Sequence, residues 1–206
     1  MNFEIQKRAL SRAIRDDLDA LIVFWPAQTE TAAADKDPIS TLVQSAIHKG
    51  DFELKAGSFL NLYGHSGIKA RHVVVVCSGD NKPAQIRSAV TAAWGVLKGA
   101  KVKRLGLHVV GDWAAEVVQS IASAMADSSY TYTATLSQPK ARTLSSLVFS
   151  AETVLAEHRL ALSQAQALTS GIELAKEWGQ PPSQPCHAHH AGRCRQAHGQ
   201  RFGIPM

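Results

Sequence analysis

Nearly continuous apolar runs alternate along this chain with segments whose apolar residues recur at helical spacing. Ala20–Trp25 and Arg71–Ser78 are apolar at almost every position, which is typical of strands buried on both faces of a sheet. Shorter apolar or alternating segments predict further strands. They are Phe3–Gln6, Phe59–Tyr63, Val102–Val110, Tyr130–Thr135 and Ser145–Ser150.

Four segments carry one apolar stripe at helical spacing and predict helices. Gly50 closes the first, Pro83 opens the second, and Asp112 is the expected N-cap of the third. The four helices are Ile39–Lys49, Pro83–Gly99, Trp113–Met125 and Thr153–Trp178. Alternating strands and helices predict an α/β fold, with a mixed, mostly parallel sheet and helices on both faces. We expect an α/β domain over residues 1–150, a long connecting helix over 151–179 and an irregular tail over 180–206.

Composition narrows the class of protein. The longest apolar run is shorter than the ~18–20 residues that span a bilayer, and the N-terminus shows no signal-peptide pattern. Three cysteines, one of them within an apolar strand, favour a reducing cytoplasm over a disulfide scaffold. Of the net charge of +5, the tail supplies +3 through Arg193, Arg195 and Arg201. The rest of the chain is nearly balanced, so a nucleic-acid partner is not expected.

The tail holds the densest set of potential metal ligands, and two interpretations stay open. Such soft and borderline ligands can bind zinc, but their spacing matches no common zinc motif, so an unstructured segment is the alternative. The residues are Cys186, His187, His189, His190, Cys194 and His198.

Other candidates also have a plain structural alternative. The loops Gly64–Gly67 and Cys77–Asp80 could cradle phosphate, but simple turns are the favoured explanation. Histidines could act as acid–base groups or pack in strands, and clustered aspartates could bind a cation or form a turn. Of the tryptophans, Trp94 and Trp113 are expected to pack between helices and sheet, and Trp178 to dock the final helix. These residues are His65, His72, His108, Asp16, Asp17, Asp19, Trp94, Trp113 and Trp178. They form no catalytic constellation, so we predict no catalytic, cofactor-binding or metal-binding residue in this chain.

Several segments, in this order, resemble the N-terminal domain of the leucyl aminopeptidase (cytosol aminopeptidase) family. They are ALIVFW, DFELKAGSFLNLY, RHVVVVCSGD and the final helical segment ALTSGIELAKEWGQPP, which ends at Pro182. The resemblance implies a fold similar to macro domains. It also implies that the complete protein is a hexameric exopeptidase. Its two zinc or manganese ions would both be held by a C-terminal catalytic domain.

Neither metal-ligand motif of the family occurs in these 206 residues. The resemblance therefore implies an inactive, cytoplasmic accessory domain that serves assembly or regulation, with the catalytic domain as its partner. Two alternatives are a macro-like module that binds a nucleotide or ADP-ribose, and a DNA-binding accessory domain.

From Gln180 the chain departs from the family pattern. Codons can be chosen for residues 179–196 so that removal of a single base restores text resembling the family. We therefore hypothesise that residues 180–199 are a frameshifted reading; a drifted or engineered tail is the alternative. Sequencing of the encoding DNA tests this hypothesis.

Overall fold

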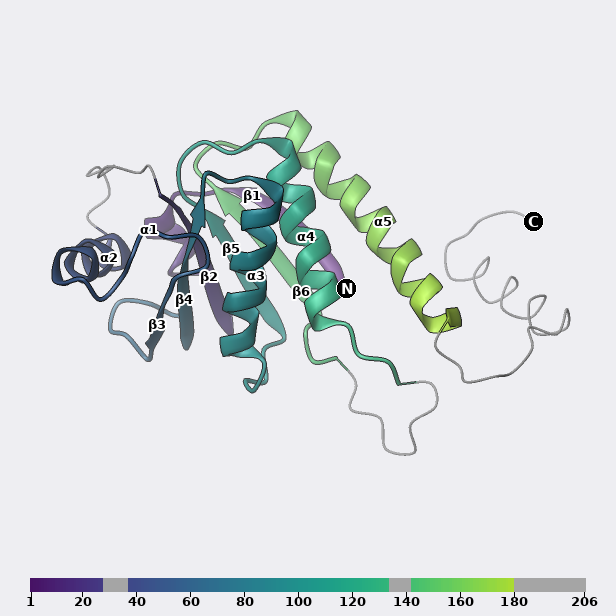
Figure 1. The fold of residues 1–206 in the computed structure, drawn as a ribbon, viewed down its shortest axis with the longest axis horizontal. Helices are drawn as coiled ribbons and strands as arrows, with labels where there is room; N and C mark the ends of the chain where they lie inside the picture. The colour runs from purple at the N-terminus through teal and green to yellow at the C-terminus, as the bar shows by residue number, and fades with distance from the viewer. Residues whose placement is uncertain (28–36, 134–141, 180–206) are drawn as a thin grey trace, which may run out of the picture.

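The structure is a computed structural model that describes residues 1–27, 37–133 and 142–179 (Figure 1). Within these ranges six strands form one sheet in the order β1-β6-β5-β2-β4-β3. All neighbours are parallel except β3 and β4. The strands are β1 (Asn2–Lys7), β2 (Ala20–Pro26), β3 (Phe59–Tyr63), β4 (His72–Gly79), β5 (Arg104–Val109) and β6 (Ser146–Ala151).

Helices cover both faces of this sheet. Figure 1 shows α3, α4 and α5 side by side across one face, and their apolar residues share a core with that face. Residues of α1 and α2 pack in a second core on the other face. The helices are α1 (Leu10–Ala13), α2 (Pro38–Lys49), α3 (Pro83–Leu97), α4 (Ala115–Ser129) and α5 (Ala156–Gly179). The predicted fold class, including the long final helix, is confirmed.

The two longest apolar runs occupy the middle of the sheet. β2 lies between β4 and β5, so both of its edges are hydrogen-bonded and both of its faces are covered. Ile22 and Phe24 contribute to the α3–α5 core, whereas Leu21 and Val23 contribute to the α1–α2 core. Side chains alternate between the faces of a strand, and here both faces are dry. A continuous apolar run is the consequence.

Two sequence-based predictions are wrong. Residues 130–133 lie outside any strand, and the remainder of the predicted strand Tyr130–Thr135 falls outside the described residues. The alternation is present, but residues 130–133 pair with none of the six strands of the sheet. Asp112 does not cap α4, whose N-cap is Ala114 with no side-chain capping bond. The turn at Gly111, with φ of 78°, and the insertion of Trp113 into the core delay the start of this helix.

Other differences concern short or terminal turns. The four-residue helix α1 escaped prediction because one turn is too short to show a period. The final helix begins at Ala156 instead of Thr153, because the Thr153 carbonyl accepts a hydrogen bond from the Trp113 indole at 2.9 Å. Among the helices in the described ranges, none has both the length and the apolar character needed to cross a membrane.

Candidate functional site

His108 and Ser150 form a buried polar pair near the carboxyl ends of β5 and β6. The Nδ1 atom of His108 lies 2.9 Å from Ser150 Oγ, and both residues are at most 4% exposed. Burial lowers the pKa of His108 from 6.5 to about 4, although the charge of Asp37 acts in the opposite direction. Asp37 itself is engaged at the start of α2, where its carboxylate accepts from Ser40 N at 2.9 Å. The pair is a neutral structural contact without access for a substrate.

The other two candidate histidines lie apart from this pair. His65 is half-buried in the loop after β3, and its Nδ1 is 2.8 Å from the carbonyl of Ser66. His72 begins β4 and makes an edge-to-face contact with the ring of Tyr63, with 5.0 Å between ring centroids. The three histidines therefore occupy three separate environments and share no substrate site.

Gly64–Gly67 is a turn, whereas Cys77–Gly79, predicted as part of a loop, form the end of β4, and the turn begins at Asp80. Gly64 and Gly67 have φ of 59° and 85°, and Gly79 has φ of 61°, a region that side chains other than glycine rarely occupy. After β4, the backbone N–H of Asp80 donates to Gln85 Oε1 at 2.9 Å. The N–H of Lys82 donates to the same oxygen at 3.4 Å. Gln85 therefore takes the donors that a phosphate would need.

The aspartates before β2 each contact a different group. Asp16 pairs with Arg8 at 2.5 Å, and Asp17 pairs with Lys69 at 3.0 Å. Asp19 accepts from the backbone N–H of Arg104 at 2.9 Å, which lowers its pKa, and from that of Lys103 at 2.8 Å. Across residues 1–27, 37–133 and 142–179, no three His, Cys, Asp or Glu side chains gather in a way that could hold a metal ion.

Two of the predicted core tryptophans are placed by the structure. Trp94 and Trp113 are 8% exposed and belong to the core between α3–α5 and the sheet. The side chain of Trp178 lies outside the described residues, as do the cysteines and histidines of the tail.

A buried histidine that the sequence did not single out holds the start of α5. His158 is 1% exposed and stacks on Trp113, with ring centroids 4.7 Å apart. The N–H of Leu155 donates to Nδ1 of His158 at 3.0 Å, so Nε2 carries the ring proton and donates to the Trp113 carbonyl at 3.0 Å. The sequence does contain a signal for this contact. Leu155 directly precedes the helix, and a side chain three residues later, here His158, can reach back to its backbone N–H.

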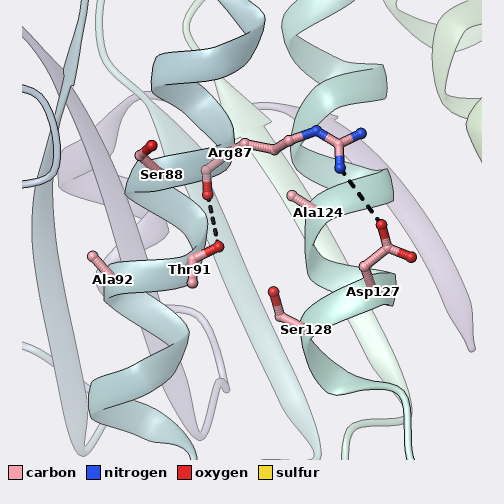
Figure 2. Close-up of a pocket in the computed structure, with 7 residues that line it drawn as sticks. All are labelled: Arg87, Ser88, Thr91, Ala92, Ala124, Asp127 and Ser128. Atoms are coloured by element: carbon pink, nitrogen blue, oxygen red, sulfur yellow. Dashed lines mark hydrogen bonds and ion pairs between the residues drawn. The ribbon is translucent and has the colours of Figure 1, made fainter.

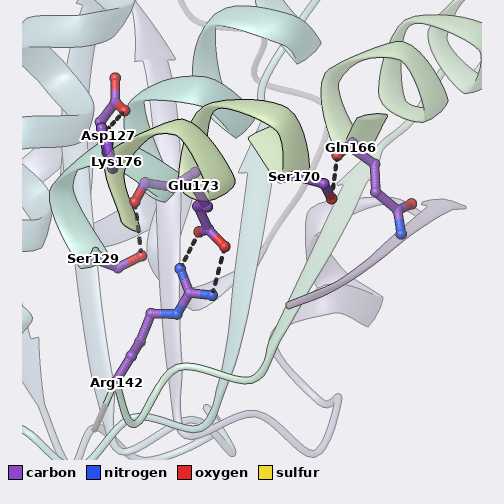
Figure 3. A network of polar contacts seen from close by, with 8 residues as sticks. Asp127, Ser129, Arg142, Gln166, Ser170, Glu173 and Lys176 are labelled. Carbon is purple, nitrogen blue, oxygen red and sulfur yellow. Dashed lines mark hydrogen bonds and ion pairs between the residues drawn. The ribbon is translucent and has the colours of Figure 1, made fainter. Parts of the chain in front are cut away.

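Ion pairs hold the far end of α5 (Figure 3). Arg142, just before β6, approaches Glu173 with both terminal nitrogens, at 2.6 and 3.5 Å. Lys176 reaches Asp127 of α4 at 2.7 Å. Between the two ends, Ala161, Leu162 and Ala165 enter the core. The helix is therefore fastened along most of its length.

The outward side of α5 still presents apolar surface. Leu160 is 60% and Leu168 is 57% exposed, and Leu155 just before the helix is 51% exposed. Single exposed leucines are ordinary on protein surfaces. Two leucines eight residues apart on one helix lie on the same side, which suits contact with a further part of a protein.

A shallow groove of about 520 Å³ runs between α3 and α4 (Figure 2). The Arg87–Asp127 ion pair, at 3.6 Å, crosses it, and Thr91 Oγ1 donates to the Arg87 carbonyl at 2.9 Å. Its lining is Arg87, Ser88, Thr91, Ala92, Ala124, Asp127 and Ser128. This lining offers neither a nucleophile–base pair nor a metal-ligand set, so it supplies no catalytic chemistry.

Comparison with known proteins decides the family. The model of the cytosol aminopeptidase family, N-terminal domain, matches residues 20–139. The chain belongs to this family. Relatives of this aminopeptidase N-terminal domain include a probable cytosol aminopeptidase of Polaromonas naphthalenivorans, 38% identical over 186 residues, which cover 89% of the chain and 36% of the relative. Another, from Variovorax paradoxus, is 36% identical over 190 residues, which cover 90% and 36%.

Solved structures share the fold. A mutant of tomato leucine aminopeptidase aligns with a TM-score of 0.65 at 18% identity, covering 88% of this chain and 38% of that one. The bottromycin maturation enzyme BotP aligns with a TM-score of 0.62 at 18% identity, covering 91% and 38%. The aminopeptidase N-terminal domain described here thus spans a little over one third of the length of its relatives.

Proposed function

We propose that this chain is the non-catalytic N-terminal domain of a leucyl aminopeptidase. The complete enzyme would remove N-terminal amino acids from peptides, with two zinc or manganese ions held by the C-terminal catalytic domain. The observation that carries the proposal is the family match, which is to the N-terminal domain, together with coverage of about 36% of the relatives. The described residues offer no candidate metal cluster of their own.

The proposed role is assembly or regulation. We propose that residues 1–150 form the accessory domain, residues 151–179 connect it to its catalytic partner, and residues 180–206 belong to the junction. The fastening of α5 at His158, in the core and at Glu173 supports a rigid spacer. In this proposal the complete enzyme is a hexamer and acts in the cytoplasm. The name of its cytosol aminopeptidase relatives supports the location.

An activity assay tests the proposal. The purified 206-residue chain is incubated with a leucine anilide substrate in the presence of manganese or zinc. The relative from Polaromonas naphthalenivorans serves as the comparison, because it is named as a probable cytosol aminopeptidase. We expect no metal-dependent release of leucine by this chain. Release that grows with protein concentration and disappears with a chelator would contradict the proposal.

A binding assay tests the role of α5. The catalytic portion of the same relative is mixed with this chain, and complex formation is followed by sedimentation velocity. We expect a complex that the double variant Leu160→Glu/Leu168→Glu abolishes, because both leucines are largely exposed on one side of the helix. The matched control is Arg159→Glu/Gln166→Glu, at exposed polar positions of α5. Equal loss in both double variants would remove the leucines from the proposal.

A further inference from the structure

A small cationic cleft lies at the amino ends of β2, β4 and β5, at the edge of the sheet opposite the start of α5. Its volume is about 240 Å³. Three cationic side chains and a single carboxylate line it. The complete lining is Leu18, Asp19, Lys69, Arg71, His72, Ala100, Lys101 and Val102.

The charge of Arg71 acts on the nearby Asp19 carboxylate and helps to lower its pKa. Lys69 pairs with Asp17 at 3.0 Å, and the Asp19 carboxylate accepts from the backbone N–H groups of Lys103 and Arg104. Arg71 and Lys101 are exposed. Within the ranges that the structure describes, neither side chain makes a hydrogen bond or an ion pair. With three cations and the single Asp19 carboxylate in its lining, the cleft presents an excess of positive charge toward an anion.

An exposed aromatic ring stands beside this charge. Tyr63 of β3 pairs with His72 of β4 in the antiparallel ladder, and its ring contacts the His72 ring edge to face. His72 lines the cleft. Tyr63 is 69% exposed, although tyrosine rings usually bury most of their apolar area. Its free ring surface is therefore available to a flat group held just outside the cleft.

We infer that this cleft binds the phosphate of a nucleoside monophosphate, with Arg71 and Lys101 on the phosphate and Tyr63 against the base. The volume of about 240 Å³ is below the roughly 300–1,000 Å³ of sites that enclose drug-sized ligands, so the phosphate enters and the base stays outside. Guanidinium and ammonium groups make charge-assisted hydrogen bonds to phosphate oxygens, and bases stack on aromatic side chains. The inference is independent of the proposed peptidase role.

The test is an NMR titration of the amide resonances of the full chain at constant ionic strength. The probes are inorganic phosphate, adenosine and AMP. We expect phosphate and AMP to shift the resonances of residues 69–72 and 100–103, with AMP at least about fivefold tighter because of the base. The double variant Arg71→Gln/Lys101→Gln should weaken the binding of phosphate and of AMP about tenfold each. The control Lys55→Gln/Arg159→Gln removes the same charges from exposed positions near the opposite edge and should change neither.

A second pair of variants tests the aromatic contact. Tyr63→Ala should abolish the advantage of AMP over phosphate and leave phosphate binding intact. Phe59→Ala is its control, because Phe59 lies on the same face of β3, pairs with Val76 far from the cleft, and is 47% exposed. An unchanged advantage of AMP in Tyr63→Ala would remove the base contact and overturn the inference.

Three further results would overturn it. The first is the absence of shifts with phosphate at about 20 mM, which exceeds the millimolar constants of weak sites. The second is equal weakening in the cleft variant and its control, which would indicate unspecific charge. The third is tighter binding of a single-stranded DNA oligonucleotide than of AMP at physiological salt, which would make the cleft part of a nucleic-acid surface. None of these readouts measures peptidase activity, so the two proposals fail separately.

Discussion

At the scale of single residues, the interior tolerates polar groups that satisfy one another. His108 and Ser150 are 42 positions apart, yet their side chains meet at 2.9 Å in the core. His158 is likewise buried, with both ring nitrogens in hydrogen bonds. A buried polar group without a partner costs about 1–3 kcal/mol. Pairing is therefore what allows these histidines to remain inside.

The first prediction concerns pH and His108. Its pKa falls from 6.5 to about 4 on folding, so between these values the unfolded chain binds a proton that the folded chain does not. The contribution of His108 to the free energy of unfolding is therefore complete above pH 6.5. It is lost as the pH falls toward 4, which lowers the free energy of unfolding by about 3 kcal/mol in total. Urea unfolding at several pH values should show this slope, and His108→Gln should remove most of it. His65→Gln, at a half-buried loop position, is the control; an unchanged slope in His108→Gln would contradict the assignment.

The second prediction concerns Gly106 in β5. A Cβ atom there would lie 2.5 Å from Leu18 Cδ1 and 2.9 Å from Leu21 Cδ1, and both leucines are buried. Gly106→Ala should lower the free energy of unfolding by about 1–3 kcal/mol, the usual range for overpacking. Gly95→Ala is the matched control in α3, where a Cβ meets nothing within 4 Å. There we expect a gain of roughly 0.5–1 kcal/mol. Equal effects in urea unfolding would contradict the packing argument.

At the scale of elements, α5 combines two kinds of fastening. Near its start, a stacked and doubly hydrogen-bonded histidine joins it to the loop before α4. Near its end, ion pairs join it to α4 and to the segment before β6. Partly exposed ion pairs contribute little, about 0–1 kcal/mol each. The start of α5 should therefore contribute most to its attachment.

The third prediction follows from this difference. His158→Ala leaves Leu155 N–H without an acceptor, the Trp113 carbonyl without its donor, and a gap beside the indole. We expect a loss of about 2–4 kcal/mol in the free energy of unfolding. The neighbouring Arg159 is exposed, so Arg159→Ala should change it by less than about 0.5 kcal/mol. Chemical unfolding followed by tryptophan fluorescence measures both; a loss in His158→Ala no larger than in Arg159→Ala would contradict the role of His158.

At the scale of the whole molecule, charge is distributed unevenly. Residues 180–206 contain three arginines and no acidic residue, which leaves 19 basic and 17 acidic side chains in residues 1–179. The region that contains the described fold thus carries a net charge of only +2. Non-specific DNA binding depends on the number of phosphates that basic side chains neutralise. So small an excess gives it little driving force.

The fourth prediction is that a variant ending at Gly179 binds DNA weakly. On immobilised duplex DNA it should elute at or below about 0.1 M salt, because few counterions are released when it binds. The complete chain is the comparison, and circular dichroism checks that the shortened variant retains its helices. Retention of the shortened variant at physiological salt would point to a clustered basic surface and would favour the DNA-binding alternative.

Local pattern was sufficient for elements whose surroundings are simple. β2 and β4 are covered on both faces, so burial alone makes their sequences continuously apolar. α2 and α3 each bury one stripe and carry local terminal signals, namely the Asp37 cap with Gly50 and the proline at the start of α3. The alternation in Tyr130–Thr135 was misleading, since a strand also needs a neighbouring strand to pair with. Local alternation does not report whether tertiary packing supplies that neighbour.

The amino-acid sequence alone was therefore enough to predict the α/β class, the central strands and the family. The first two depend on neighbours close in sequence, and the family depends on segments similar to those of relatives. The order of the strands, the meeting of His108 with Ser150 and the clamp of Arg142 on Glu173 required the folded chain. So did the cleft, where Asp19 meets the backbone of Lys103, 84 positions away. Such contacts join residues that the chain separates by 31 positions or more, and only the packing of helices against the sheet brings them within hydrogen-bonding distance.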